Sequence, residues 1–411
     1  MLRWGELRRE PFRLLFPLGA FFGCLGVGHW LGYGAGWSAT YSGFYHASMQ
    51  VGLYMTCFVV GFLLTALPRF SSTPPASHVE WLAVLMLLVV QTASLSAGRW
   101  IIAESAWVGL LMLVALFAGR RFVRQRSLTP PPTEFVWIPI AILFGVAGTV
   151  LLIGGQLGGW PAWTLGVGRP MAQQGWLLGI VLGVGGFMAP RLMGRDVWTS
   201  ATSGLAPARV QQVRRRRMLL HGVAGACLLA SFFIEGHGAI RWAYLVRAVV
   251  VTAELTWTTQ CVRPPRVKDR YVILLWYALW AIILGVWGAA LWPRYRVAAL
   301  HIVFLGGFSL MTFAVGAMVV LSHSGQGERL RHPLWVLRVV GWGIGGALVL
   351  RLIAESQPET FFRWLSAASV LWLIAGVSWI LFVLPLTLRP LSPGAFESVH
   401  EAAKRKLLSS R

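Results

Sequence analysis

Apolar residues recur in twelve stretches along this chain of 411 residues, and short polar or charged connections separate them. A helix needs roughly 20 apolar residues to cross about 30 Å of hydrocarbon, and each stretch approaches that length. The pattern predicts an all-α polytopic membrane bundle of about 12 transmembrane helices. They are expected near residues 12–32, 44–67, 79–97, 99–118, 136–154, 172–190, 218–235, 240–259, 270–291, 298–321, 333–354 and 365–387.

Positive residues follow the same periodicity, because most of the 36 Lys and Arg residues lie near the termini and in every second connection. Cytoplasmic loops of membrane proteins carry an excess of Lys and Arg, so the pattern predicts that both termini are cytoplasmic. The connections expected on the outer side hold only a few: Arg99, Arg169, Arg241, Arg294, Arg296, Arg351 and Arg363.

Composition supports the lipid bilayer as the main partner, since 56% of residues are hydrophobic and 12% are charged. The net charge of +22 would suggest nucleic acid in a soluble protein, but here the charge follows topology, so we expect no nucleic-acid binding. Residues 1–390 are predicted to form a single twelve-helix membrane domain, followed by a basic cytoplasmic tail at 391–411. The longest connection, about 191–217, is predicted to be a basic cytoplasmic loop.

Histidines are the main candidates for chemistry, because ionisable groups inside a bilayer are costly and often functional. His46 and His301 fall in the outer parts of the second and tenth helices, at similar depth, and His29 also belongs to the outer side. Facing helices could present two such imidazoles to a haem iron. The alternative is that each imidazole only bonds a backbone carbonyl. Arg294 and Arg296 could pair with haem propionates or simply extend toward the interface.

The other candidate metal ligands lie at the inner side. His323 is about 33 Å along the helix from His301 at 1.5 Å per residue, so one metal cannot bind both. His221 lies at the inner end of the seventh helix. Arg247 and Glu254 are seven residues apart on one helix face, which predicts a buried ion pair or part of a proton route.

Motifs of soluble enzymes are missing from the sequence. It contains no GxxxxGK[ST] phosphate loop, no HExxH and no GxSxG, and no carboxylate pair falls in an expected span. It also lacks CxxC and CxxCH, so a zinc ribbon and covalent c-type haem attachment are not indicated. Hydrolase and ATPase functions are therefore excluded as interpretations, and whether the protein is an enzyme is left open.

Two segments carry a family resemblance: YHASMQVGLYMTCFVVGFLLTALPRF at residues 45–70 and LHIVFLGGFSLMTFAVGAMVVLSHSG at 300–325. They resemble the NnrS family of bacterial membrane proteins, whose second helix typically reads WHAHEMLFGF and whose tenth reads LHALTVGAIGTMILAVMTRVALGHTGR. EPFRLLF at 10–16 and GGFMAP at 185–190 are also similar to family segments. The histidines of these motifs match His46, His301 and His323.

The resemblance implies a twelve-helix inner-membrane protein that contains haem and copper and acts in the response to nitric oxide. Ser48 and Met49 stand where the family has His and Glu, and the ninth helix lacks the family's His. We therefore expect a divergent member with fewer metal centres. Its expected role is the nitric oxide response or membrane electron transfer, with a bis-His haem between helices 2 and 10 and with redox partners or other membrane subunits.

A second hypothesis comes from a different class of protein. Twelve helices with both ends inside also suit a secondary transporter, or a structural subunit of a larger membrane complex. In that case the histidines would be packing or proton-relay groups, and Arg247 with Glu254 would mark the pathway. A transporter would have no haem absorbance, which separates the two hypotheses.

Overall fold

The computed structural model describes residues 4–124, 130–195 and 197–389. This part of the chain is helical and contains no strand, which confirms the all-α class. The first half runs through α1 (Trp4–Arg9), α2 (Phe12–Gly34), α3 (Gly43–Ala47), π-helix η1 (Ser48–Met55), α4 (Thr56–Ser71), α5 (His78–Ser96), α6 (Trp100–Val123), η2 (Thr133–Val136), α7 (Trp137–Gln156), α8 (Trp163–Pro170), π-helix η3 (Met171–Gly175), α9 (Trp176–Ile180), π-helix η4 (Val181–Gly185), α10 (Gly186–Leu192) and α11 (Val197–Thr202).

The second half has the same character. It runs through α12 (Pro207–Gly236), α13 (Ile240–Thr259), α14 (Arg270–Leu291), η5 (Pro293–Tyr295), α15 (Arg296–His301), π-helix η6 (Ile302–Ser309), α16 (Leu310–His323), η7 (Gly327–Arg331), α17 (Trp335–Ser356), η8 (Pro358–Thr360) and α18 (Phe361–Thr387). Three long spans contain π-helical segments: η1 lies within the span from α3 to α4, η3 and η4 lie within the span from α8 to α10, and η6 lies within the span from η5 to α16.

Eleven helical spans in the described residues are long and apolar enough to cross a membrane, as a multi-pass protein requires. The remaining expected span is α13, which has the length of a span but carries Arg241, Arg247 and Glu254. It packs between α12 and α14 within the bundle. Two of these charged residues, Arg247 and Glu254, are buried, so neighbouring helices rather than lipid surround them.

The predicted long loop at 191–217 is wrong in two places, because α11 (Val197–Thr202) lies within it and α12 forms its last part. Helix α12 begins at Pro207, so the run of arginines at 214–217 forms its first turns rather than a loop. Proline is favoured at the first position of a helix, and Arg and Gln are good helix formers. From the sequence we predicted a helix only for the apolar part of α12, near 218–235, because a polar helix outside the bilayer has the same charge pattern as a loop.

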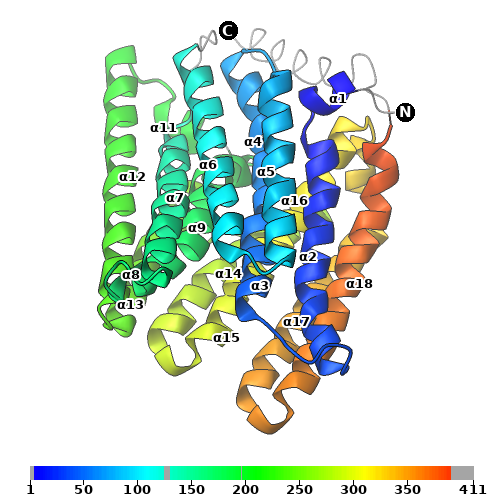
Figure 1. Cartoon of the computed structure of the whole chain (residues 1–411). Helices are drawn as coiled ribbons and strands as arrows, with labels where there is room; N and C mark the ends of the chain where they lie inside the picture. Colours follow the sequence, from blue (N-terminus) through cyan, green and yellow to red (C-terminus); the bar gives the residue numbers. More distant parts are fainter. Residues whose placement is uncertain (1–3, 125–129, 196, 390–411) are drawn as a thin grey trace.

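The two ends of the described chain meet at one end of the bundle (Figure 1). The guanidinium of Arg13, at the start of α2, donates to the carbonyl oxygen of Arg389 at 2.7 Å. Arg69, at the end of α4, donates to Glu10 at 2.8 Å. We call this side, which contains Glu10, Arg69 and Arg389, the terminal end. The opposite side, where α3, α8 and α15 lie, is the distal end (Figure 1).

Candidate functional site

A large cavity in the distal half of the bundle brings the two main candidate histidines together. His46 and His301 both line it, and its volume is about 900 Å³. Ligand pockets in proteins usually measure roughly 300–1,000 Å³, so this space is large enough for a cofactor. Its walls come from α2, α3 and η1, α8 and η3, α12, α13, α15 and η6, α17 and α18. We call it the histidine cavity.

Both imidazoles are oriented by the same kind of hydrogen bond. Nδ1 of His46 bonds the carbonyl oxygen of Gly26 at 2.9 Å, and Nδ1 of His301 bonds that of Val297 at 2.7 Å. Because a carbonyl only accepts, Nδ1 must carry the proton, and the neutral ring then has its lone pair on Nε2. Neither Nε2 has a hydrogen-bond partner among the described residues. Histidines that bind metals are commonly fixed in this tautomer.

A glycine contact explains why the carbonyl of Gly26 reaches His46. A Cβ at position 26 would lie 2.7 Å from Cβ of Met49 and 2.7 Å from Nε2 of Gln50, so only glycine allows this approach of α2 to η1. The Gln50 amide adds a hydrogen bond of 2.9 Å to the carbonyl of Gly23 on α2. The position of His46 is therefore set by the packing of two helices.

Widened helical turns frame the cavity. π-Helix η1 begins two residues after His46, and η6 begins directly after His301. A third π-helix, η3, supplies Gln173 and Gln174 to the cavity wall. π-Helical segments are rare and often occur at functional sites, because they rotate side chains out of the regular α-helical register. The sequence analysis did not anticipate these segments.

Most of the charged side chains on the cavity wall are positive. Arg169, Arg296 and Arg351 line it, whereas Glu235 is the only carboxylate among the lining residues. Arg351 also donates to Glu355 at 3.0 Å. Of the two arginines predicted for haem propionates, Arg296 is a lining residue. Arg294 is not among the lining residues, and its guanidinium lies over the ring of Tyr295 at 5.7 Å.

The predicted pairing of Arg247 with Glu254 is wrong. Arg247 forms an ion pair with Glu235 on α12, and Glu254 bonds His221 at 2.8 Å. Seven residues separate two side chains by about 10.5 Å along a helix, which is too far for a direct contact. Arg247 also donates to Gln174 Oε1 at 3.0 Å. Because Glu235 and Gln174 both line the cavity, Arg247 holds two residues of the cavity wall in place.

The remaining predicted ligands lie elsewhere. His29 is outside the cavity lining, and its Nε2 accepts the backbone N–H of Ser42 at 2.7 Å. His323 lies at the terminal end, where it bonds Glu10 at 2.8 Å. His221 is fully buried against Glu254. Within the described ranges, no group of three or more His, Cys, Asp or Glu residues could hold a metal ion.

Sequence reasoning missed several cavity residues. Arg169 and Arg351 were interpreted only as loop charges in the topology, and Gln174, Glu235 and Tyr244 were not considered. Arg351 offered a hint, because it lies inside a long apolar helix that ends five residues later at Ser356. A charge held that far inside a span usually faces a cavity or a partner.

The fold and the site together define a class: a multi-pass α-helical membrane protein with a histidine- and arginine-lined cavity. Comparison with protein families then identifies the particular family, because the profile described as NnrS protein matches residues 6–390. The chain therefore belongs to the NnrS family. No curated protein matches this sequence.

Proposed function

We propose that this protein binds haem in the histidine cavity, with His46 and His301 as its two axial ligands. The supporting observation is that both rings line one cavity while their Nδ1 atoms are held by backbone carbonyls. Each ring therefore offers Nε2 in the form that coordinates iron. Neutral imidazole is a common axial ligand of haem in proteins.

The rest of the cavity fits the same group. Phe304, Leu305 and Trp372 provide apolar surface for a flat macrocycle, and the guanidinium groups of Arg296 and Arg351 suit two propionates. When bound, haem supplies one-electron redox chemistry. The protein's own residues hold it by ligation, balance the propionate charge and limit access of water.

The match to the NnrS family over residues 6–390 supports a membrane protein of this type. We propose a role in the nitric oxide response or in membrane electron transfer, together with redox partners or other membrane subunits. The NnrS family is also linked to copper, yet His323 and His221 each bond a carboxylate and lie outside the cavity lining. The proposal therefore assigns a haem site and no copper site.

We also propose an orientation in the bacterial inner membrane. The terminal end is rich in arginine, including Arg8, Arg9, Arg69, Arg120 and Arg121, so the positive-inside rule places it in the cytoplasm. The histidine cavity then lies on the periplasmic side. Residues 1–390 form one membrane domain in this proposal. The predicted basic tail at 391–411 lies outside the described residues.

The deciding experiment is a reduced-minus-oxidised spectrum of detergent-purified protein, with metal analysis. The wild type should show a haem spectrum, and His46→Ala and His301→Ala should each lose it while remaining folded. His237→Ala is a matched control, because Nδ1 of His237 also bonds the carbonyl four residues earlier, Phe233, at 2.8 Å. His237 does not line the cavity, so its variant should keep the spectrum.

One observation favours a second function, a secondary transporter or structural subunit. Glu235 on the cavity wall is paired with the buried Arg247, an arrangement that also suits a polar substrate. A colourless, metal-free protein that is folded would refute the haem proposal and support this alternative. A haem spectrum retained in both histidine variants would refute the ligand assignment alone.

A further inference from the structure

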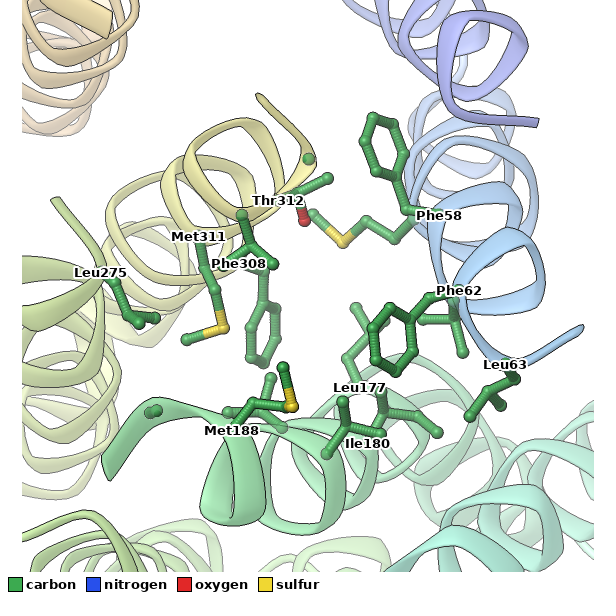
Figure 2. Close-up of a pocket in the computed structure, with 18 of the residues that line it drawn as sticks. Phe58, Phe62, Leu63, Leu177, Ile180, Met188, Leu275, Phe308, Met311 and Thr312 are labelled. Atoms are coloured by element: carbon green, nitrogen blue, oxygen red, sulfur yellow. The ribbon is translucent and has the colours of Figure 1, made fainter. Parts of the chain in front are cut away.

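A second, smaller cavity lies between α4, the segment η4–α10 and the rod formed by η6 and α16. Its volume is about 130 Å³. Figure 2 shows Phe62, Phe308, Met188 and Met311 around this space, contributed by helices far apart in the sequence. We call it the apolar pocket.

The wall of the apolar pocket offers almost nothing to a polar ligand. Thr312 carries the only hydroxyl, amide or charged group among the side chains that line it; the others are aliphatic, aromatic or thioether groups. A buried water needs two to four polar partners, so water is poorly held there. Apolar cavities of roughly 150 Å³ stay dry and accept xenon or benzene. Larger ligands need pockets of roughly 300 Å³ or more.

The apolar pocket adjoins the histidine cavity. Met55, at the end of η1, lines both spaces. On η6, Phe308 lines the apolar pocket and the next residue, Ser309, lines the histidine cavity. The partition is therefore about one side chain thick. Methionine is unbranched, with three rotatable side-chain bonds, so Met55 can change rotamer more easily than a branched residue.

Of the four π-helices in the described residues, two form this boundary and a third lines the apolar pocket. η1 and η6 line both spaces, and η4 supplies Val181, Val184 and Gly185 to the apolar pocket. Because π-helical turns concentrate at functional sites, their presence around both spaces sets this pocket apart from an ordinary packing defect. The volume of the apolar pocket, its apolar wall and its position beside the histidine cavity all suit a small apolar ligand.

We propose that the apolar pocket binds small, uncharged gas molecules and supplies them to the histidine cavity past Met55. Such molecules dissolve in the hydrocarbon of the bilayer and need no hydrogen-bond partner. Binding in the pocket involves no covalent step and does not require haem. The supply role rests on the proposed haem function.

Xenon tests the pocket directly. Crystals of the purified protein pressurised with xenon should show an anomalous peak between Met188, Phe308 and Met311. Val184→Phe and Val315→Phe add bulk from two different walls and should each abolish the peak. Val150→Phe makes the same change on an exposed position of α7 outside the lining, so the peak should remain. Two variants that fill the pocket are used, so that the test still holds if one of them does not fold.

The supply role has its own measurement. In haem-loaded protein, Val184→Phe should slow the spectral change caused by dissolved nitric oxide, and Val150→Phe should leave the rate unchanged. Lipid or ordered water in place of the xenon peak would overturn the pocket assignment. Equal rates in the two variants would overturn the supply role. A colourless protein with the xenon peak would refute the haem function and the supply role, and leave gas binding standing.

Discussion

Arg247 on α13 and Glu235 on the preceding helix α12 form an ion pair that is almost completely shielded from solvent. The hydroxyl of Tyr244 donates to Glu235 at 3.4 Å, and the amide of Gln174 donates to Tyr244 at 3.0 Å. Since Arg247 donates in turn to Gln174, the four side chains close a ring of polar contacts. Glu235, Tyr244 and Gln174 also line the histidine cavity, so the ring is part of the site.

Breaking this pair should be costly. Glu235→Ala leaves Arg247 charged and buried without its carboxylate, and removal of one partner of a buried pair typically destabilises a protein by about 3–5 kcal/mol. The double variant Glu235→Ala with Arg247→Met removes both charges and should recover most of that loss. Thermal unfolding in detergent measures both effects.

A surface carboxylate provides the comparison for the buried pair. Glu359 is exposed, and its replacement by alanine should change stability by no more than about 0.5 kcal/mol. A Glu235→Ala variant as stable as Glu359→Ala would show that the pair contributes little. A double variant less stable than Glu235→Ala would show that Arg247 has other essential contacts.

Arginines on the cavity wall should hold the acidic groups of the cofactor. Arg351→Gln removes a guanidinium from the wall, and the loss of one charge-assisted hydrogen bond, about 1.5–3 kcal/mol, should weaken haem retention by roughly 10- to 150-fold. Competition with an apo-haem acceptor measures retention. Arg294→Gln is the matched control, since Arg294 does not line the cavity. Equal retention in the two variants would contradict the assigned role of Arg351.

The composition and periodicity of the sequence were sufficient for the fold. Each of the twelve expected spans contains a long helix, because apolar length is a property of one segment and needs no knowledge of its neighbours. The similar depth of His46 and His301 in the membrane also predicted that they act together, and both line one cavity. Depth follows from counting residues at 1.5 Å each once the direction of the helix is known.

The side chains that pair with the buried charges could not be predicted in the same way. Arg247 and Glu254 share a helix face, but the side chains they bind, Glu235 and His221, lie on α12. Which residue meets which depends on the rotation of one helix against another, and a π-helical turn shifts that rotation within a span. Arg351 was missed for the same reason, because its sequence position does not say whether it faces lipid or a cavity.

A methyl group at position 26 should disturb the site without touching either histidine. In Gly26→Ala the new Cβ would lie 2.7 Å from Met49 and Gln50, so α2 and η1 must separate. We expect a loss of about 1–3 kcal/mol of stability, typical of overpacking, and weaker haem retention as the carbonyl withdraws from His46. Gly28→Ala has nothing within 4 Å of its Cβ and should be neutral or slightly stabilising. The two variants behaving alike would contradict this account.

The proposed orientation can be tested with single cysteines. Ala39 precedes α3 at the distal end, and Ser203 follows α11 between two arginine-rich segments. In a background without the native cysteines, a membrane-impermeant thiol reagent should label Ala39→Cys in intact cells whose outer membrane is permeable. Ser203→Cys should react only after the inner membrane is opened. The reverse pattern would place the histidine cavity on the cytoplasmic side.

Glu10, which lies at the terminal end, should make the stability of the protein depend on pH. Burial alone would raise the pKa of this carboxyl, but its hydrogen bonds to His323 and Arg13, with their charges, outweigh burial and lower the pKa from 4.5 to about 2. A carboxyl whose pKa is lower in the folded state stabilises the protein above its unfolded pKa. That contribution, about 3 kcal/mol for a shift of this size, is lost as pH falls from about 4.5 to about 2.

Unfolding of the detergent-purified protein between pH 6 and pH 2 checks this expectation. Glu10→Gln should be less stable than wild type at pH 6, because Arg13 and Arg69 lose the carboxylate to which both donate. Below pH 4.5 the difference between the two proteins should shrink, since the wild-type carboxyl becomes protonated as well. Glu359→Gln, an exposed carboxyl at the distal end, should follow the wild-type curve throughout. A Glu10→Gln curve parallel to wild type down to pH 2 would mean that Glu10 does not titrate in this range.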